Sequence, residues 1–225
     1  MAAVDAFLSD PVGFMDANVV LQGVSGAGVV GNVAAFTFLG SAAPGTRTNG
    51  KACKVYEMKK VGDAGGEKDK LDAYWCPYAD DKVNAVTLAA EADYMFTAKM
   101  DGCSFGVGMA GADGAVRVAH ANTSNSDELD AIVEQIIAAG VKDPAKASAL
   151  AMAKFRTKSG QQMGQLSGAL GGVTTAVGPM DYSAVGLLST TFGVRVKGQW
   201  SFFFHLYQKK GPGFEVLGCF PFPNR

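Results

Sequence analysis

The residues whose types and spacing suit catalysis are a cysteine beside a glycine turn and a histidine further along the chain. Cys103 directly follows the pair Asp101-Gly102, and His120 follows an alternating segment, residues 115–119, that favours a strand. A thiol and an imidazole that face each other across neighbouring strands can react together, because the imidazole takes the thiol proton. The sequence therefore predicts attack by Cys103 on a carbonyl carbon, with His120 as base and then as acid. Backbone N–H groups of the turn could line an oxyanion hole.

Strands and a helix are needed to position this pair. Residues 93–100 favour a strand that enters the turn before Cys103, and residues 105–109 favour a second short strand. The most regular helical pattern of the sequence lies at residues 125–140, after His120, with its apolar residues on one face. We expect this helix to pack on the sheet and to fix the loop that follows His120.

The rest of the chain predicts short strands and two further helical regions. Asp10-Pro11 is a good helix start, so we expect one or two short helices over residues 4–18. A longer helix is expected from residue 143 to about residue 154, and the glycine-rich segment 159–178 predicts a frayed helix or a loop. Further strands are predicted at residues 33–39, 52–59, 72–77, 83–88, 190–196, 200–208 and 214–220.

Length and charge limit the classes of protein to consider. The 225 residues are enough for one domain, residues 1–225, with a full hydrophobic core. The net charge is −1, which gives no electrostatic reason to expect binding to nucleic acid or to an anionic membrane. Charged residues are sparse at 18%, and the 29 glycines indicate many turns. Together these features favour a compact α/β or α+β protein.

The remaining cysteines and the second histidine are expected to be structural. Cys53, Cys76 and Cys219 form no CxxC pair with one another or with Cys103, so we expect reduced, buried thiols and no metal site. His205 lies in an aromatic run and is expected in the core. The N-terminus lacks a basic region and is not a Sec signal peptide, and the most apolar window, residues 24–40, is too broken for a transmembrane helix.

The segment from residue 93 to Cys103, DYMFTAKMDGC, resembles the strand and Gly-Cys turn of a family of glutamine deamidase toxins. This family includes Burkholderia lethal factor and the catalytic domains of cytotoxic necrotizing factors. Its turn reads Leu-Ser-Gly-Cys, where this chain has Met-Asp-Gly-Cys. Residues 75–78, WCPY, are similar to a Trp-x-Pro-aromatic segment of the family, and a histidine follows on the next strand, as His120 does here. The resemblance covers residues 72–122 and about 200–208.

This resemblance implies a fold, a reaction and a site. The implied fold is an α/β (α+β) sandwich of mixed, largely antiparallel β-sheets with helices packed outside. The implied reaction converts a glutamine of a host protein to glutamate without a cofactor. Cys103 would be the nucleophile, His120 the general base and acid, and the backbone carbonyl of Thr97 the third catalytic element. Known relatives act on Rho-family GTPases or on an initiation-factor RNA helicase.

The resemblance also implies where the protein works. We expect a monomeric bacterial effector that is secreted or injected without a Sec signal and that acts in the host cytoplasm. Two other classes remain open. One is a different Cys–His acyl-transfer enzyme, such as a transglutaminase or a thiol protease; the other is a non-enzymatic effector or interaction domain in which Cys103 is an inert buried thiol. A catalytic Cys103 is expected to alkylate faster than the other three cysteines, with a pKa below that of free cysteine.

Overall fold

A computed structural model describes residues 2–23, 33–62, 69–122, 135, 143–182 and 187–223 of the chain. The helix expected at residues 125–140 lies outside these residues, apart from Gln135. Within the described part, the chain is a mixed α/β protein that consists mostly of sheet with few helices. The described residues include no helix with both the length and the apolar character needed to cross a membrane.

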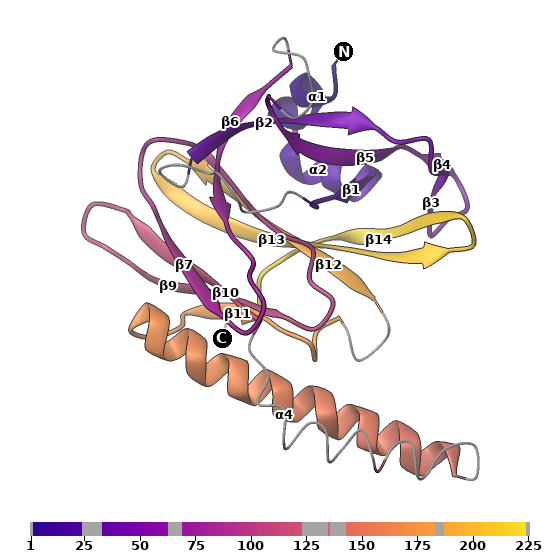
Figure 1. The fold of residues 1–225 in the computed structure, drawn as a ribbon. Coiled ribbons are helices and arrows are strands. Elements are labelled where there is room, and N and C mark those ends of the chain that lie inside the picture. The colour runs from indigo at the N-terminus through magenta and orange to yellow at the C-terminus, as the bar shows by residue number, and fades with distance from the viewer. Residues whose placement is uncertain are drawn as a thin grey trace.

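The described strands form two sheets that lie one above the other (Figure 1). The larger sheet has the order β1-β5-β2-β6-β8-β12-β13-β14-β3-β4, and the smaller sheet has the order β11-β9-β10-β7. The strands of the larger sheet are β1 (Val19–Leu21), β2 (Val33–Gly40), β3 (Gly45–Arg47), β4 (Ala52–Cys53), β5 (Val55–Lys60), β6 (Leu71–Cys76), β8 (Tyr94–Thr97), β12 (Leu188–Val196), β13 (Gln199–Lys210) and β14 (Gly213–Pro221). The strands of the smaller sheet are β7 (Val83–Leu88), β9 (Ser104–Ala110), β10 (Val116–Ala121) and β11 (Thr175–Val177).

The larger sheet is mixed and curled. Most of its neighbouring strands are antiparallel, but β1 with β5, β6 with β8, and β14 with β3 are parallel. Strand β1 also contacts β14, although the two are far apart in the sheet order. Val19 and Val55 pack with Tyr207 and Val216 in one buried cluster, which brings these distant strands together. The predicted arrangement of mixed, largely antiparallel sheets is therefore confirmed at this level.

Two short helices cover the face of the larger sheet that is turned away from the smaller one. They are α1 (Ala3–Ser9) and α2 (Pro11–Ala17), as Asp10-Pro11 predicted. The Asp10 side chain caps α2 by accepting a hydrogen bond from the Gly13 N–H at 2.9 Å. Phe7 and Phe14 pack edge to face at 5.8 Å between centroids and join the aromatic core of this face.

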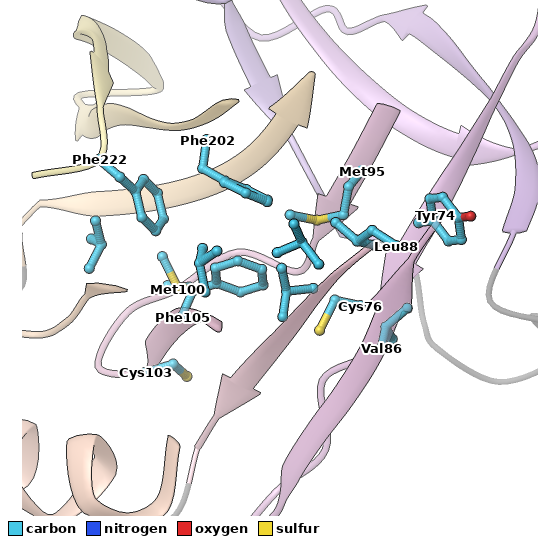
Figure 2. Close-up of a cluster of buried hydrophobic side chains, with 14 of the residues drawn as sticks. Tyr74, Cys76, Val86, Leu88, Met95, Met100, Cys103, Phe105, Phe202 and Phe222 are labelled. Carbon is cyan, nitrogen blue, oxygen red and sulfur yellow. The ribbon is translucent and has the colours of Figure 1, made fainter. Parts of the chain in front are cut away.

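The core between the two sheets contains aromatic, aliphatic and sulfur-containing side chains from both (Figure 2). Strands β6, β8 and β13 of the larger sheet supply Tyr74, Met95 and Phe202, and β7 and β9 of the smaller sheet supply Leu88 and Phe105. Figure 2 shows Cys103 at the edge of this cluster, on the side of the neighbouring helix. One face of the smaller sheet is therefore buried against the larger sheet.

The other face of the smaller sheet is covered by α4 (Pro144–Leu170), which runs along the outside of the molecule (Figure 1). The sequence-based boundary near residue 154 was wrong, because the helix continues through the glycine-rich segment and ends only at Gly171, with φ 69°. The glycines inside the helix cost about 1 kcal/mol each, but Leu166 and Gln162 are fully buried against the sheet. Tertiary packing therefore outweighs the low helix propensity of the segment.

Most predicted strands are present, with changes at their ends. The segment expected as one strand at residues 52–59 is divided into β4 and β5, because β4 pairs with β3 while β5 pairs with β1 and β2. The three-residue strands β1, β3 and β11 were not predicted, since such short segments carry little periodicity. His205 is fully buried as expected, with its ring stacked on Tyr207 at 5.3 Å.

Candidate functional site

The register of the β9–β10 hairpin brings Cys103 and His120 together. His120 lies opposite Phe105, and continuing this register places Cys103 opposite Asn122. Residues two apart on a strand point to the same face, so all four side chains share the face that is turned toward the larger sheet. Diagonal neighbours on one face lie roughly 7 Å apart, within reach of a ring side chain. The predicted pair therefore lies on one face of the smaller sheet, at the edge of the core between the sheets.

Thr97 fixes the tautomer of His120. The Thr97 hydroxyl lies 2.6 Å from Nδ1 of His120 and donates to the carbonyl of Cys76 at 2.9 Å. A hydroxyl has one proton, so it accepts from Nδ1–H while it donates to Cys76. The lone pair of His120 is then on Nε2, which is buried and has no hydrogen-bond partner among the described residues. His120 is thus arranged to accept a proton at Nε2.

The contact made by Thr97 differs from the one that the family resemblance implies. The resemblance assigns the role to the backbone carbonyl, but the side-chain hydroxyl is the atom on His120. With the Gln22 side-chain amide oriented so that its nitrogen faces these acceptors, it donates to the Thr97 carbonyl at 2.5 Å and to the Thr191 carbonyl at 3.2 Å. The contact with His120 therefore depends on the side chain at position 97, whereas any residue could supply a backbone carbonyl.

Thr97→Val is expected to disturb both the stability and the reactivity of the site. It leaves the Cys76 carbonyl and His120 Nδ1 without their partner, which costs about 2 kcal/mol of unfolding free energy. Because the tautomer is no longer fixed, alkylation of Cys103 should slow about tenfold. Urea unfolding and peptide mass spectrometry measure the two effects. Thr97→Ser keeps the hydroxyl and should behave like the wild type; equal losses in both variants would contradict the assignment.

The resting pair is neutral. Burial lowers the pKa of His120 from 6.5 to about 4, and burial raises the pKa of the Cys103 thiol to about 12. Only 2% of Cys103 and 1% of His120 is exposed. The expectation of a thiol with a lowered pKa is therefore wrong for this closed arrangement. Thiolate forms only when the proton moves to His120 or when the site opens.

A lysine of α4 opposes the effect of burial on the thiol. Lys158 lowers the pKa of Cys103, whereas Asp101 and Asp80 raise it. The lysine lies over the turn, since a Cβ on Gly102 would be 3.1 Å from Lys158 Nζ. Gly102 has a φ of +145°, which side chains rarely adopt. Glycine is thus required here by the backbone conformation, whereas the flexible lysine side chain can shift slightly to make room for a Cβ.

Two polar side chains from outside the hairpin anchor the Gly-Cys turn. The Tyr182 hydroxyl accepts from the Gly102 N–H at 3.2 Å and donates to the Cys103 carbonyl at 2.6 Å. Gln162 donates to the Gly102 carbonyl at 3.1 Å and accepts from the Ser104 hydroxyl at 2.7 Å. The Gly102 N–H is therefore already used and is not a free oxyanion-hole donor. Sequence reasoning missed both residues, because neither belongs to a local motif.

Tyr182→Phe should lower the unfolding free energy by about 3 kcal/mol, because it leaves a buried N–H and a buried carbonyl of the turn unsatisfied. Tyr182 is fully buried, so water cannot replace its hydroxyl without rearrangement. Urea unfolding measures the loss. Tyr94→Phe, at a half-buried ring, is the matched control and should cost less than about 1 kcal/mol. A similar loss in both variants would argue against the anchoring role.

A polar network covers the thiol. The Cys103 S–H donates to Oδ1 of Asn122 at 3.1 Å, and Nδ2 of Asn122 donates to the Tyr78 hydroxyl at 2.9 Å and to Asp80 at 3.3 Å. Tyr78 donates to Asp80 at 2.5 Å, and its ring meets the His120 ring edge to face at 5.5 Å. The thiol is therefore bonded to Asn122 rather than to His120 in the resting protein.

The other three cysteines are also free thiols, and Cys76 lies beside the site, because its carbonyl accepts a hydrogen bond from the Thr97 hydroxyl. Cys76 is fully buried, whereas Cys53 and Cys219 are only half-buried. The prediction that these three thiols are buried is therefore confirmed for Cys76 and wrong for Cys53 and Cys219. Among the residues that the structure describes, no three His, Cys, Asp or Glu side chains gather closely enough to bind a metal ion. Comparison of the sequence with models of protein families found no match, and comparison with curated proteins found no significant match.

Proposed function

We propose that this protein is a glutamine deamidase that converts a glutamine of a target protein to glutamate, on a fold of the cytotoxic-necrotizing-factor catalytic-domain type. The observation that carries the proposal is the state of His120. Its Nδ1–H is bonded to Thr97, and its Nε2, on the sheet face that also carries Cys103, has no hydrogen-bond partner in the part of the chain that the structure describes. This arrangement supplies a base for the thiol without a cofactor.

The proposed reaction proceeds by acyl transfer. Nε2 of His120 takes the Cys103 proton while Sγ attacks the carboxamide carbon of the glutamine. The imidazolium then protonates the nitrogen, ammonia leaves and a thioester remains. Water, deprotonated by the same Nε2, attacks the thioester, and glutamate is released as the proton returns to sulfur. Lys158 lies over the turn and lowers the pKa of Cys103, so it favours the negative charge on sulfur and on the tetrahedral intermediate.

The family resemblance supports the rest of the proposal. It favours a bacterial toxin or effector of one catalytic domain, a monomer that acts in the host cytoplasm. The target would be a host protein, a GTPase or a translation-factor helicase by analogy with the family. The chemistry on its own fits any carbonyl that a thiol can attack, so the choice of glutamine rests on the resemblance.

The test is peptide mass spectrometry of host-cell lysates incubated with the wild type and with Cys103→Ser. The proposal expects one peptide in which glutamine becomes glutamate, with the wild type only. Cys219→Ser is the matched control and should retain the activity, because Cys219 lies outside the network around His120. Identical peptide maps for wild type and Cys103→Ser, in lysates of several hosts, would overturn the proposal.

One observation favours a second candidate, a non-enzymatic interaction domain. Cys103 is almost fully buried, and burial raises its thiol pKa to about 12, which is typical of an inert structural cysteine. In that case His120→Gln would leave the alkylation rate of Cys103 unchanged. A strong dependence of this rate on His120 would instead support the enzyme.

A further inference from the structure

Asn122 places a carboxamide where the substrate carboxamide has to come. Its Oδ1 is 3.1 Å from Sγ of Cys103, and the carbon that a thiol attacks in a carboxamide is one C=O bond, about 1.2 Å, from that oxygen. Cys103 is 2% exposed and its thiol is bonded to Asn122, so a glutamine that approaches the sulfur from this side has to take the space that the Asn122 side chain now fills. The backbone N–H of Asn122 donates to Lys82 at 3.1 Å, so the side chain can turn away while the backbone stays in place.

The nitrogen of this carboxamide faces two acceptors. The single hydroxyl proton of Tyr78 goes to Asp80, so the Tyr78 oxygen accepts from Asn122. The bond to Asp80, together with burial, raises the pKa of Tyr78 to about 12, which keeps that proton in place. Asp80 accepts from the same nitrogen. Two acceptor oxygens favour a group with an N–H and disfavour an oxygen in its place.

We infer that Tyr78 and Asp80 form an amide-binding pair for the leaving nitrogen of the target glutamine, and that Asn122 occupies this place in the resting protein. The inference rests on the proposed deamidase and names the groups that select its substrate. On this inference, the Asn122 carboxamide occupies the place of the target glutamine carboxamide until the target binds.

The amide-binding pair also serves the steps that follow attack. When His120 protonates the nitrogen, Tyr78 and Asp80 accept its N–H groups as ammonia departs. The product carboxylate has an oxygen where the nitrogen was, next to the Asp80 carboxylate and the Tyr78 lone pair. Like charges and facing acceptors repel, so the product leaves and Asn122 returns to the thiol.

Two alkylating probes test the inference without knowledge of the target. Iodoacetamide carries a primary carboxamide, and N,N-dimethyl-iodoacetamide has the same reactive carbon without an N–H. Alkylation of Cys103 is followed by peptide mass spectrometry and divided by that of half-buried Cys53 in the same sample. In Asn122→Ala the place is vacant, so iodoacetamide should react about tenfold faster than in the wild type. The rate of alkylation by the dimethyl probe should rise much less.

Further variants separate the possible outcomes. Adding Tyr78→Phe and Asp80→Ala to Asn122→Ala should remove the preference for iodoacetamide, and Asn122→Ser is the second variant if alanine reduces stability. No change in Asn122→Ala, or an equal gain with both probes, would overturn the inference. Adding His120→Gln to Asn122→Ala tests separately whether His120 is the base for the Cys103 thiol. A preference without any deamidation would count against the deamidase alone, whereas deamidation without a preference would count against the amide-binding pair.

Discussion

His120→Gln is expected to lower the rate of the proposed glutamine deamidation by about 10²- to 10⁴-fold, the contribution typical of a general acid–base group. Glutamine retains an N–H that can reach the Thr97 hydroxyl, but it cannot take a proton at neutral pH. The Cys103 thiol would then keep its proton, because burial raises its pKa to about 12 and its hydrogen bond goes to the Asn122 carboxamide, which is not a base. Deamidation and alkylation are both measured by peptide mass spectrometry.

His205→Gln is the matched control for this variant. His205 is also fully buried, and its Nδ1 lies 3.3 Å from the Thr190 hydroxyl, much as His120 lies beside Thr97. The unfolding free energy should therefore fall in both variants, but only His120→Gln should slow deamidation and the alkylation of Cys103. If His120→Gln and His205→Gln react equally fast, His120 is not the base, whatever the stability of the two variants.

Acid should destabilise the protein strongly at a pH well above the usual range of carboxylates. Burial lowers the pKa of His120 and of His205 to about 4 in the folded protein, from 6.5. Above pH 6.5 both histidines are neutral in the folded and in the unfolded protein, so they do not lower the unfolding free energy. Between 6.5 and 4 only the unfolded chain binds the protons, which costs about 3 kcal/mol for each histidine. A total of about 6 kcal/mol is comparable to the whole stability of many domains.

Urea unfolding at several pH values between about 6.5 and about 4.5 isolates this effect. Glu91 and Glu215 have pKa values lowered from 4.5 by their hydrogen bonds to Tyr74 and Lys210, so their contributions are lost only at lower pH. In His205→Gln the slope of unfolding free energy against pH should fall by about half. A stability that stays level down to about pH 4.5 would show that the histidines are not buried in neutral form.

The sequence predicted those residues of the candidate site whose type alone suits catalysis, and not the residues that hold them in place. Cys103 and His120 stand out in the sequence because few residues are suited to nucleophilic chemistry. The register of β9 and β10 then places them on one face, and short alternating segments allowed both strands to be predicted. Tyr182 and Gln162 could not be predicted, since the sequence does not show which distant hydroxyl or amide satisfies a buried turn.

The same limit applies to the fold. Periodicity identified most strands, and Asp10-Pro11 identified the start of α2. The length of α4 was missed because its exposed glycines suggested a loop, whereas Leu166 and Gln162 bury its other face. The order of strands in the larger sheet depends on contacts between distant segments, which local patterns do not contain.

The closed cover over Cys103 has a consequence for oxidation. Thiolates are the form that peroxides oxidise, and an exposed nucleophilic cysteine is lost irreversibly once it reaches the sulfinic state. In the resting protein the sulfur is a protonated thiol, bonded to Asn122 and 2% exposed. The proposed nucleophile is therefore protected from oxidants in the resting protein. On this proposal it becomes vulnerable when the Asn122 side chain turns away, so each opening exposes the same atom to substrate and to damage.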